Sequence, residues 1–173
     1  MRKTLLLVNG PMGVGKSVVC RELLELLRPG AYLDGDWCWM TRPFQVTEES
    51  RVMVMDNITA LLGRFLRSPD LKYVIFGWVM HQEEIARTIL RRLDLTDTVV
   101  ARYTLLCSPE TLRERIEKDI AAGLRTPDAA ERSLAYLPLY EGQPTTKIMT
   151  DRLTPSQTAM AIAAQITVQG DPL

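Results

Sequence analysis

"VNGPMGVGKSV", residues 8–18, places three glycines within six positions and then a lysine and a serine, directly after an apolar run. The run at 4–8 is continuous, as expected for a strand that is buried on both faces. After Lys16, apolar residues recur at helical spacing as far as Leu27, and Pro29-Gly30 ends that helix. The stretch therefore joins a buried strand to an amphipathic helix.

Residues 10–17, here called the phosphate loop, fit the pattern of glycine, four residues, glycine, lysine and serine. The glycines let the backbone turn so that successive amides point inward around anionic oxygens, and the following helix adds roughly half a positive charge. Lys16 can reach the β- and γ-phosphates, and the Ser17 hydroxyl can bind Mg²⁺. The alternative is a flexible glycine turn with a solvated lysine, which the two flanking elements disfavour. We predict a nucleotide-binding set of Gly10, Pro11, Met12, Gly13, Val14, Gly15, Lys16, Ser17 and Val18.

Strands alternate with helices along the rest of the chain. Strands are expected at 4–8, 31–33, 73–76, 98–107 and 147–149, and helices at 16–27, from 47 onward, at 82–93, from 108 onward, at 129–137 and at 156–166. The helix that follows Thr47 is expected to bury Val54, Ile58, Leu61 and Phe65. This alternation predicts a single three-layer α/β/α domain over residues 1–173, with a mainly parallel sheet.

Composition sets limits on partners and compartment. Lys plus Arg and Asp plus Glu both number 21, and a net charge of zero argues against general nucleic-acid binding. Three widely spaced cysteines form no metal-ligand pair and no disulfide framework, which indicates a reducing cytoplasm. The run at 5–8 is too short for a signal peptide or a membrane span. We expect a cytoplasmic monomer or homodimer that binds no membrane.

An acidic pair, Asp34-Gly35-Asp36, follows the second expected strand at the carboxyl edge of the sheet, where open α/β folds bind ligands. One carboxylate can hold a water on Mg²⁺, and the other can accept a proton from a substrate hydroxyl. An acidic turn is the alternative, because Asp-Gly is a common turn pair. The nearby phosphate loop favours catalysis.

Strand, phosphate loop, helix and strand, followed by "LDGD" at 33–36, resemble the small-molecule branch of the nucleoside-monophosphate-kinase-like P-loop kinases. Gluconate kinase and adenylylsulfate kinase carry a similar Asp-Gly-Asp, shikimate kinase has a related acidic pair, and chloramphenicol phosphotransferase has an acid in this region. The spacing of later elements is similar to that of tunicamycin-resistance-type proteins. The resemblance implies the P-loop nucleoside triphosphate hydrolase fold, with a five-stranded parallel sheet in the order 2-3-1-4-5.

The resemblance also implies roles for individual residues. ATP phosphates would lie on the phosphate loop, Asp34 close to Mg²⁺, and Asp36 on the acceptor hydroxyl as base or positioner, although the two aspartates could be reversed. A mobile lid with arginines would cover the phosphates, and residues 113–140 are its candidate. Arg113 and Arg115 lie on a helix, where Arg113 can instead pair with Glu117. The expected catalytic set is Lys16, Asp36, Arg125 and Arg132.

The third strand departs from many phosphate-loop enzymes. "YVIFGWVMH" at 73–81 ends in Gly77-Trp78 and has no aspartate at the Walker-B position. Without that acid, Asp34 and Ser17 would have to position the metal ion. The same absence argues against motor or AAA-type ATPases, which need acids at this strand end. The absence of an Asn-Lys-x-Asp signature weakens a GTPase interpretation.

Aromatic residues follow both the second and the third strand, so they are expected in one crevice. All three tryptophans of the chain converge there and offer flat apolar walls, although packing under a helix is an equal alternative. Arg42 could bind an anionic acceptor group or be a surface charge. The only histidine, His81, could orient substrate or be structural. The predicted acceptor-binding set is Asp34, Asp36, Trp37, Trp39, Arg42, Trp78 and His81.

These patterns predict a kinase that uses ATP and Mg²⁺ to move the γ-phosphoryl group to a hydroxyl of a small organic molecule, either a metabolite or an antibiotic. The alternative is an ATP-binding switch or partner-binding module with little transfer activity. The missing strand-end acid and the scattered arginines motivate this alternative.

Overall fold

A five-stranded, all-parallel sheet forms the centre of the protein, and the computed structural model describes residues 2–170. The strands are β1 (Lys3–Asn9), β2 (Gly30–Asp34), β3 (Tyr73–Gly77), β4 (Thr98–Leu106) and β5 (Thr146–Met149). Their order is β2-β3-β1-β4-β5, with β1 hydrogen-bonded between β3 and β4. The predicted sheet order is confirmed.

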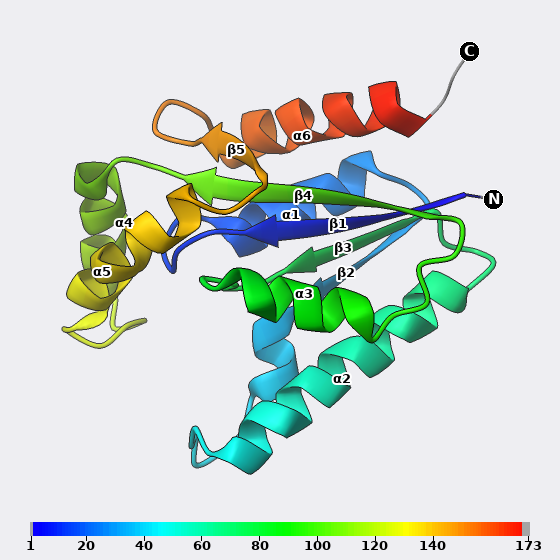
Figure 1. Ribbon diagram of the computed structural model, residues 1–173. Coiled ribbons are helices and arrows are strands. Elements are labelled where there is room, and N and C mark those ends of the chain that lie inside the picture. Colours follow the sequence, from blue (N-terminus) through cyan, green and yellow to red (C-terminus); the bar gives the residue numbers. More distant parts are fainter. Residues whose placement is uncertain (1, 171–173) are drawn as a thin grey trace.

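Helices cover both faces of this sheet (Figure 1). They are α1 (Lys16–Leu26), α2 (Glu48–Arg67), α3 (Glu83–Arg91), α4 (Pro109–Ala121), α5 (Ala129–Glu141) and α6 (Pro155–Gly170), with a short 3₁₀-helix, η1 (Gly35–Trp39). Leu6 and Val8 of β1 pack into a core with α1 and α6, whereas Leu5 and Leu7 pack into a second core with α2 and α3. This alternation along one strand produces the three layers. In Figure 1, α4 and α5 lie beyond the carboxyl ends of β1 and β4.

Two helices differ from the sequence prediction. In α2, Leu62 and Leu66 are buried in place of the predicted Leu61 and Phe65, and Leu61 is 37% exposed. The buried stripe therefore keeps i, i+4 spacing along the whole helix. The last lid helix, α5, runs to Glu141 although it contains Pro138, because Leu137 and Tyr140 are buried against the core. Tertiary packing overrides the local signal to stop.

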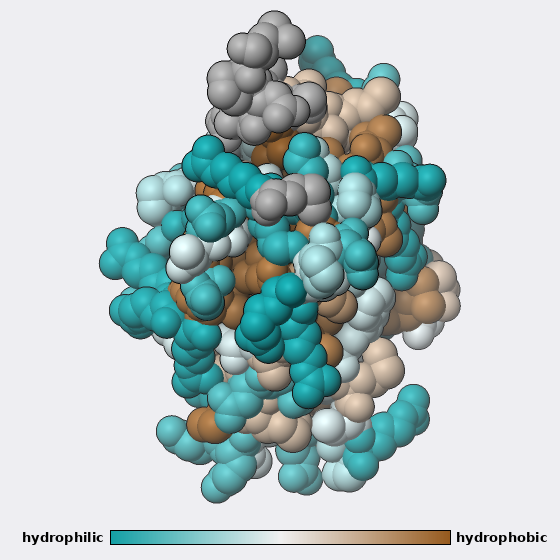
Figure 2. Space-filling model, turned by 90° about the vertical axis from the view of Figure 1, so that its right-hand side faces the viewer, coloured by the Kyte–Doolittle hydropathy of each residue, from teal (hydrophilic) through white to brown (hydrophobic). Residues whose placement is uncertain are grey.

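The face at the amino ends of the strands is mixed in character. Figure 2 shows hydrophilic side chains spread over it with smaller apolar areas between them. All three cysteines of the chain, Cys20, Cys38 and Cys107, are free and buried. Within residues 2–170, no helix combines the length and the apolar content that crossing a bilayer requires.

Candidate active site

The phosphate loop is pressed closely against its neighbours. Gly10 and Gly13 have φ values of 144° and 86°, in the region that favours glycine. A Cβ on Gly10 would lie 2.5 Å from the Leu105 carbonyl oxygen, and one on Gly13 would lie 2.4 Å from Ile116 Cγ1. At Gly15 an added Cβ would meet no atom within 4 Å. The loop is therefore fixed on the side of β4 and α4 and open on the other side.

Lys16 lies over the loop that precedes it. Its Nζ donates hydrogen bonds to the carbonyl oxygens of Gly10 (2.8 Å) and Pro11 (2.9 Å). Burial lowers the pKa of this ammonium to about 8, against the opposing charges of Asp36 and Asp34. A buried cation with only neutral hydrogen-bond partners is prepared to receive an anion.

Asp34 and Ser17 form an oxygen pair beside the loop. The Asp34 carboxylate is 7% exposed, and its Oδ2 accepts hydrogen bonds from the Ser17 and Tyr32 hydroxyls, both at 2.7 Å. Its Oδ1 accepts one from the Asp36 backbone N–H at 3.1 Å, which caps η1. A hydroxyl and a carboxylate are the donors that Mg²⁺ takes together with phosphate oxygens, so the pair fits this ion.

Asp36 is held by a tryptophan from the neighbouring strand. The Trp78 Nε1–H donates a hydrogen bond to Asp36 Oδ1 at 3.1 Å. The indole lies directly against the backbone of Gly35, where a Cβ would come within 2.3 Å of Trp78 Cγ. Glycine between the two aspartates therefore lets Trp78 approach and orient Asp36.

Gly77, at the end of β3, stands where many phosphate-loop enzymes have the Walker-B acid. A Cβ there would lie 2.9 Å from Cys20 Sγ and 3.4 Å from the Tyr32 ring. A longer side chain at this position would have to displace the Tyr32 and Asp34 pair. The space beside Ser17 is thus served from β2 and not from β3.

These groups line one cleft of about 790 Å³ at the carboxyl ends of the strands. Besides Arg125 and Arg132, eleven of the sequence-predicted residues contribute to it: Pro11, Met12, Gly13, Gly15, Lys16, Ser17, Val18, Asp34, Asp36, Trp78 and His81. Gly10 and Val14 act from behind the loop, since Gly10 accepts from Lys16 and Val14 accepts from Arg115.

Three of the predicted acceptor residues, Trp37, Trp39 and Arg42, do not line the cleft. Trp37 is 50% exposed and packs edge-on against Tyr32, with ring centroids 5.3 Å apart. Trp39 packs between Phe44 and Trp78, and its buried Nε1–H has no partner among the described residues. Arg42 is exposed in the segment that leads to α2. Only Trp78 forms an aromatic wall from this group, because η1 and residues 40–46 lead away from the strand ends.

Both predicted lid arginines line the cleft, each paired with a carboxylate. Arg125 Nε donates to Asp119 Oδ2 and Arg132 Nε pairs with Asp128 Oδ2, both at 2.8 Å. Arg113 lies 4.0 Å from Glu117 and outside the cleft, in agreement with the alternative reading as a surface pair.

Arg115 lines the cleft although the sequence analysis did not assign it a catalytic role. Its guanidinium donates to the Val14 carbonyl (3.2 Å) and to the Thr150 carbonyl (2.9 Å) and hydroxyl (3.0 Å). The sequence did contain a signal for this role: Arg115 comes about one turn after Leu112, on the buried side of α4. Arg113 does not lie on that side.

Helix α5 contributes residues that the sequence analysis missed. Ser133, Tyr136 and Tyr140 line the cleft, and the Tyr136 ring lies 4.9 Å from the His81 ring across it. Ser133 Oγ donates to the Met12 carbonyl at 2.7 Å and so fixes α5 to the phosphate loop. The spacing of Ala130, Ser133, Leu137 and Tyr140 marks the buried face and was the available signal.

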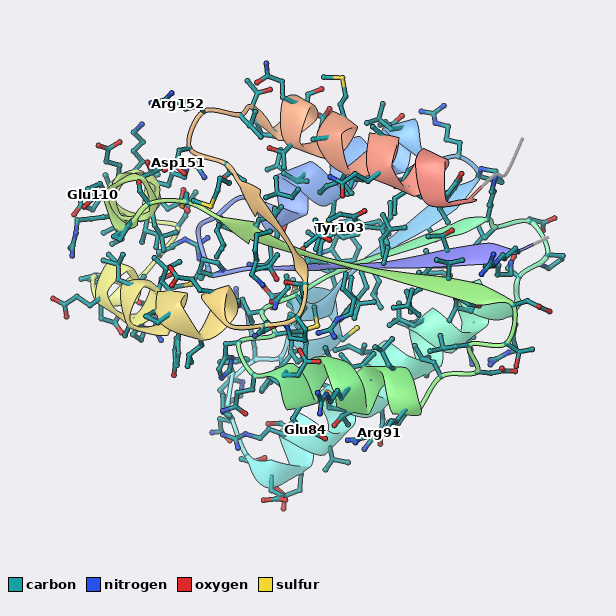
Figure 3. All side chains as sticks on the ribbon, turned by 45° about the horizontal axis from the view of Figure 1, so that its top comes forward. Glu84, Arg91, Tyr103, Glu110, Asp151 and Arg152 are labelled. Atoms are coloured by element: carbon teal, nitrogen blue, oxygen red, sulfur yellow. The ribbon has the colours of Figure 1, made fainter. Side chains whose placement is uncertain are left out.

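A second, smaller hollow of about 170 Å³ lies on the other side of Gly15. Its wall consists mainly of apolar side chains, with Arg115, Thr150 and Thr158. It shares Gly15, Val18 and Arg115 with the main cleft. Asp151 ties the end of β5 to the start of α4 beside it, since its Oδ1 accepts from the Ser108 N–H at 2.8 Å. Figure 3 places Asp151, Arg152 and Glu110 at this end of the sheet, whereas Glu84 and Arg91 form an ion pair on the surface of α3.

A buried amide network connects the phosphate loop to both cleft walls. Asn9 Oδ1 accepts from the backbone N–H groups of Gly10 and Met80, both at 2.8 Å. Asn9 Nδ2 donates to the Met80 carbonyl and to Gln143 Oε1, both at 2.9 Å. Gln143 Nε2 also donates to the Met80 carbonyl at 2.8 Å. The network therefore fixes the loop, the segment after β3 and the end of α5 relative to one another.

Asn9→Leu should lower the free energy of unfolding by about 3 kcal/mol, because it leaves buried backbone donors without partners. Urea unfolding measures this loss. Gln143→Leu should cost less, since the Oδ1 bonds of Asn9 remain. The double variant should lose less than the sum of the two, because they share one network. Full additivity would contradict the coupling.

Comparisons with known proteins agree with this geometry. The family model described as an AAA domain matches residues 6–128. No curated protein sequence matches the chain.

Among solved structures, the fold is similar to that of the tunicamycin resistance protein of Deinococcus radiodurans, with 22% identity, 95% of this chain and 96% of that chain covered, and a TM-score of 0.72. A gluconokinase from Sinorhizobium meliloti 1021 has 17% identity, coverages of 98% and 99%, and a TM-score of 0.64. Shikimate kinase from Acinetobacter baumannii, in complex with shikimate, has 20% identity, coverages of 98% and 96%, and a TM-score of 0.65. The fold is therefore shared over nearly the whole chain.

Proposed function

Because this chain belongs to the AAA domain family, whose model spans residues 6–128, we propose that its cleft binds ATP and transfers the γ-phosphoryl group to a hydroxyl of a small molecule. One observation carries the proposal: Asp36, oriented by Trp78, lines the same cleft as the phosphate loop and Lys16. An acceptor seated at Asp36 would therefore lie beside the phosphates. The kinase names of the gluconokinase and shikimate kinase neighbours support this reaction class.

The family also corrects one expectation. The missing acid after β3 argued against AAA-type proteins, yet the chain matches an AAA domain model. The contact between Asp34 and Ser17 gives a physical reason, because it supplies from β2 the carboxylate that the other proteins take from the Walker-B strand.

Two hollows on either side of Gly15 suit the two ends of ATP. Phosphates would lie against the inward amides, Lys16 and Ser17, and the base would enter the hollow of 170 Å³ beside Arg115. Ser17 and Asp34 would hold Mg²⁺, which neutralises part of the phosphate charge when it is bound.

The transfer step follows from this placement. The acceptor oxygen attacks the γ-phosphorus while Asp36 takes the hydroxyl proton, and the bond to the β-phosphate oxygen breaks to release ADP. Lys16 stabilises charge on the transferring group. Arg125 and Arg132 would join it by exchanging their carboxylate partners for phosphate oxygens, because both line the cleft.

The alternative function, an ATP-binding switch or partner-binding module, is favoured by the carboxylate pairing of both arginines. ADP release with and without candidate acceptors separates the two functions. A kinase should release ADP much faster with its acceptor, and the released ADP should match the phosphorylated product in amount. Triphosphate binding without any stimulation across a broad acceptor panel would favour the switch.

Triphosphate binding should depend on the protonation of Lys16. The lowered pKa of about 8 means that the free protein loses this ammonium as pH rises through 8, whereas bound phosphates should raise the pKa again. Affinity should therefore fall by up to about ten-fold per pH unit above pH 8. Calorimetry at pH 9 in two buffers of different ionisation enthalpy should detect proton uptake on binding. Equal uptake by Lys16→Met would contradict the assignment.

A further inference from the structure

The cations that line the cleft belong to the phosphate side. They are Lys16 of the loop, Arg115 and Lys118 of α4, Arg125 between α4 and α5, and Arg132 at the start of α5. Neither η1 nor the segment between β3 and α3 contributes a cation, and both segments lie within the described residues. Positive charge is thus confined to the region where a triphosphate would need it.

Most of these cations are already engaged. Arg115 donates to backbone carbonyls and the Thr150 hydroxyl, and Arg125 and Arg132 are paired with Asp119 and Asp128. Among the described residues, Lys118 is the one cleft cation without a hydrogen bond or ion pair. It lies on α4, three residues after Arg115, and so on the phosphate side.

The opposite wall would repel an anion. Its charged group is Asp36, beside the indole of Trp78. Burial lowers the pKa of His81, so its imidazole is neutral at neutral pH. An acceptor that carries a carboxylate or phosphate there would face Asp36. The cation that acts on Asp36 is Lys16 of the phosphate loop, which a bound triphosphate would occupy, so the acceptor's own charge would stay unpaired and be repelled.

The arginines that could have bound an anionic acceptor lie elsewhere. Arg42 and Arg51 are both exposed and do not line the cleft. Of the two alternatives for Arg42, its exposed position agrees with a surface charge.

The same wall offers flat rings and hydroxyl groups. Trp78 lines the cleft, and so do His81 and Tyr136, whose rings pack at a tilt of 38°. Tyr140 is 2% exposed and lines the cleft, and its hydroxyl makes no hydrogen bond to any described residue. A hydroxyl at the cleft surface without a protein partner is free to bond a polar group of a ligand. Ring faces with polar tips suit a hydroxylated ring.

Resting on the proposed function, the structure assigns the acceptor to a class: we infer that it is an uncharged, hydroxylated ring compound, such as a nucleoside or glycoside. Asp36 receives the reactive hydroxyl, the aromatic wall contacts the ring, and Tyr140 bonds a second polar group. Organic acids and nucleoside monophosphates are excluded by the charge of Asp36.

Matched pairs of compounds test this class. Uridine is compared with uridine monophosphate, methyl glucoside with methyl glucuronide, and methyl shikimate with shikimate, by calorimetry with Mg²⁺ and a non-hydrolysable ATP analogue. At least one neutral member should bind, and it should bind at least about ten-fold more tightly than its anion. A factor of ten is the effect expected when repulsion from Asp36 costs about 1.4 kcal/mol. Tighter binding of the anion overturns the inference, and so does the absence of any neutral ligand while the analogue binds.

Variants give the test an internal check. Tyr140→Phe should weaken the neutral ligand several-fold and leave analogue binding intact. His81→Arg should improve binding of the matching anion, because it adds the missing cation. If Arg42→Ala abolishes binding of an acid, the inference is overturned. Failure of the ATP analogue to bind wild type would instead defeat the proposed function, so the two failures are distinguishable.

Discussion

Lys16→Met is expected to lower both triphosphate affinity and phosphoryl transfer by about 10²–10³-fold, the effect of removing one preorganised donor from developing charge. The ammonium sits buried over the phosphate loop and contacts only the carbonyls of Gly10 and Pro11. Its desolvation has already occurred in the free protein, so a bound polyphosphate gains a cation that water does not screen. Methionine keeps the length and apolar stem and removes the charge.

Lys72→Met is the matched control. Lys72 lies over the Tyr73 ring at the amino end of β3, at the opposite end of the sheet from the cleft. Calorimetry with a Mg²⁺–ATP analogue and an ADP-release assay should show near wild-type values for this control. Thermal unfolding of both variants checks that each is folded. Triphosphate affinity of Lys16→Met within a factor of two of wild type would contradict the placement of the phosphates.

The sequence predicted the structure best where a short local pattern can adopt only one backbone arrangement. The phosphate loop pattern requires a strand before it and a helix after it, and β1 and α1 have those positions. Period and cap signals predicted α4 from Ser108-Pro109, and the Ser108 hydroxyl accepts from the Thr111 N–H as expected of a cap. Such features depend on neighbours within a few residues, so a single sequence contains them.

Contacts between distant segments were not predictable in this way. Asn9 and Gln143 are 134 positions apart, yet their side chains share a hydrogen bond. The sequence analysis ended the expected helix at residue 137, whereas α5 continues to Glu141, two residues before Gln143. Tyr136 lies inside the expected helix and Tyr140 beyond its expected end, and the role of both in the wall depends on where α5 packs. The positions of Trp37 and Trp39 also depend on distant contacts, because their rings pack against Tyr32 and Trp78 and do not line the cleft.

Asp36→Asn is expected to reduce kcat by about 10²–10⁴-fold, the range for loss of a general base, while triphosphate affinity stays close to that of wild type. Asparagine is nearly isosteric, and its Oδ1 can still accept from Trp78 Nε1–H, so the wall keeps its shape. The change therefore removes the proton acceptor and little else. Single-turnover transfer to the acceptor, with analogue binding measured in parallel, separates chemistry from binding.

Asp34→Asn completes this experiment, because the two aspartates have different surroundings. Asp34 is buried and accepts from Ser17, Tyr32 and the Asp36 N–H, so its loss should weaken Mg²⁺-dependent triphosphate binding and stability together. Asp56→Asn, which breaks a surface pair with Arg92, serves as the control. A result in which Asp36→Asn impairs Mg²⁺-dependent binding and Asp34→Asn impairs only kcat would reverse the two roles. Unchanged kcat in Asp36→Asn would remove the base, since no other carboxylate reaches the wall that carries Trp78 within the described residues.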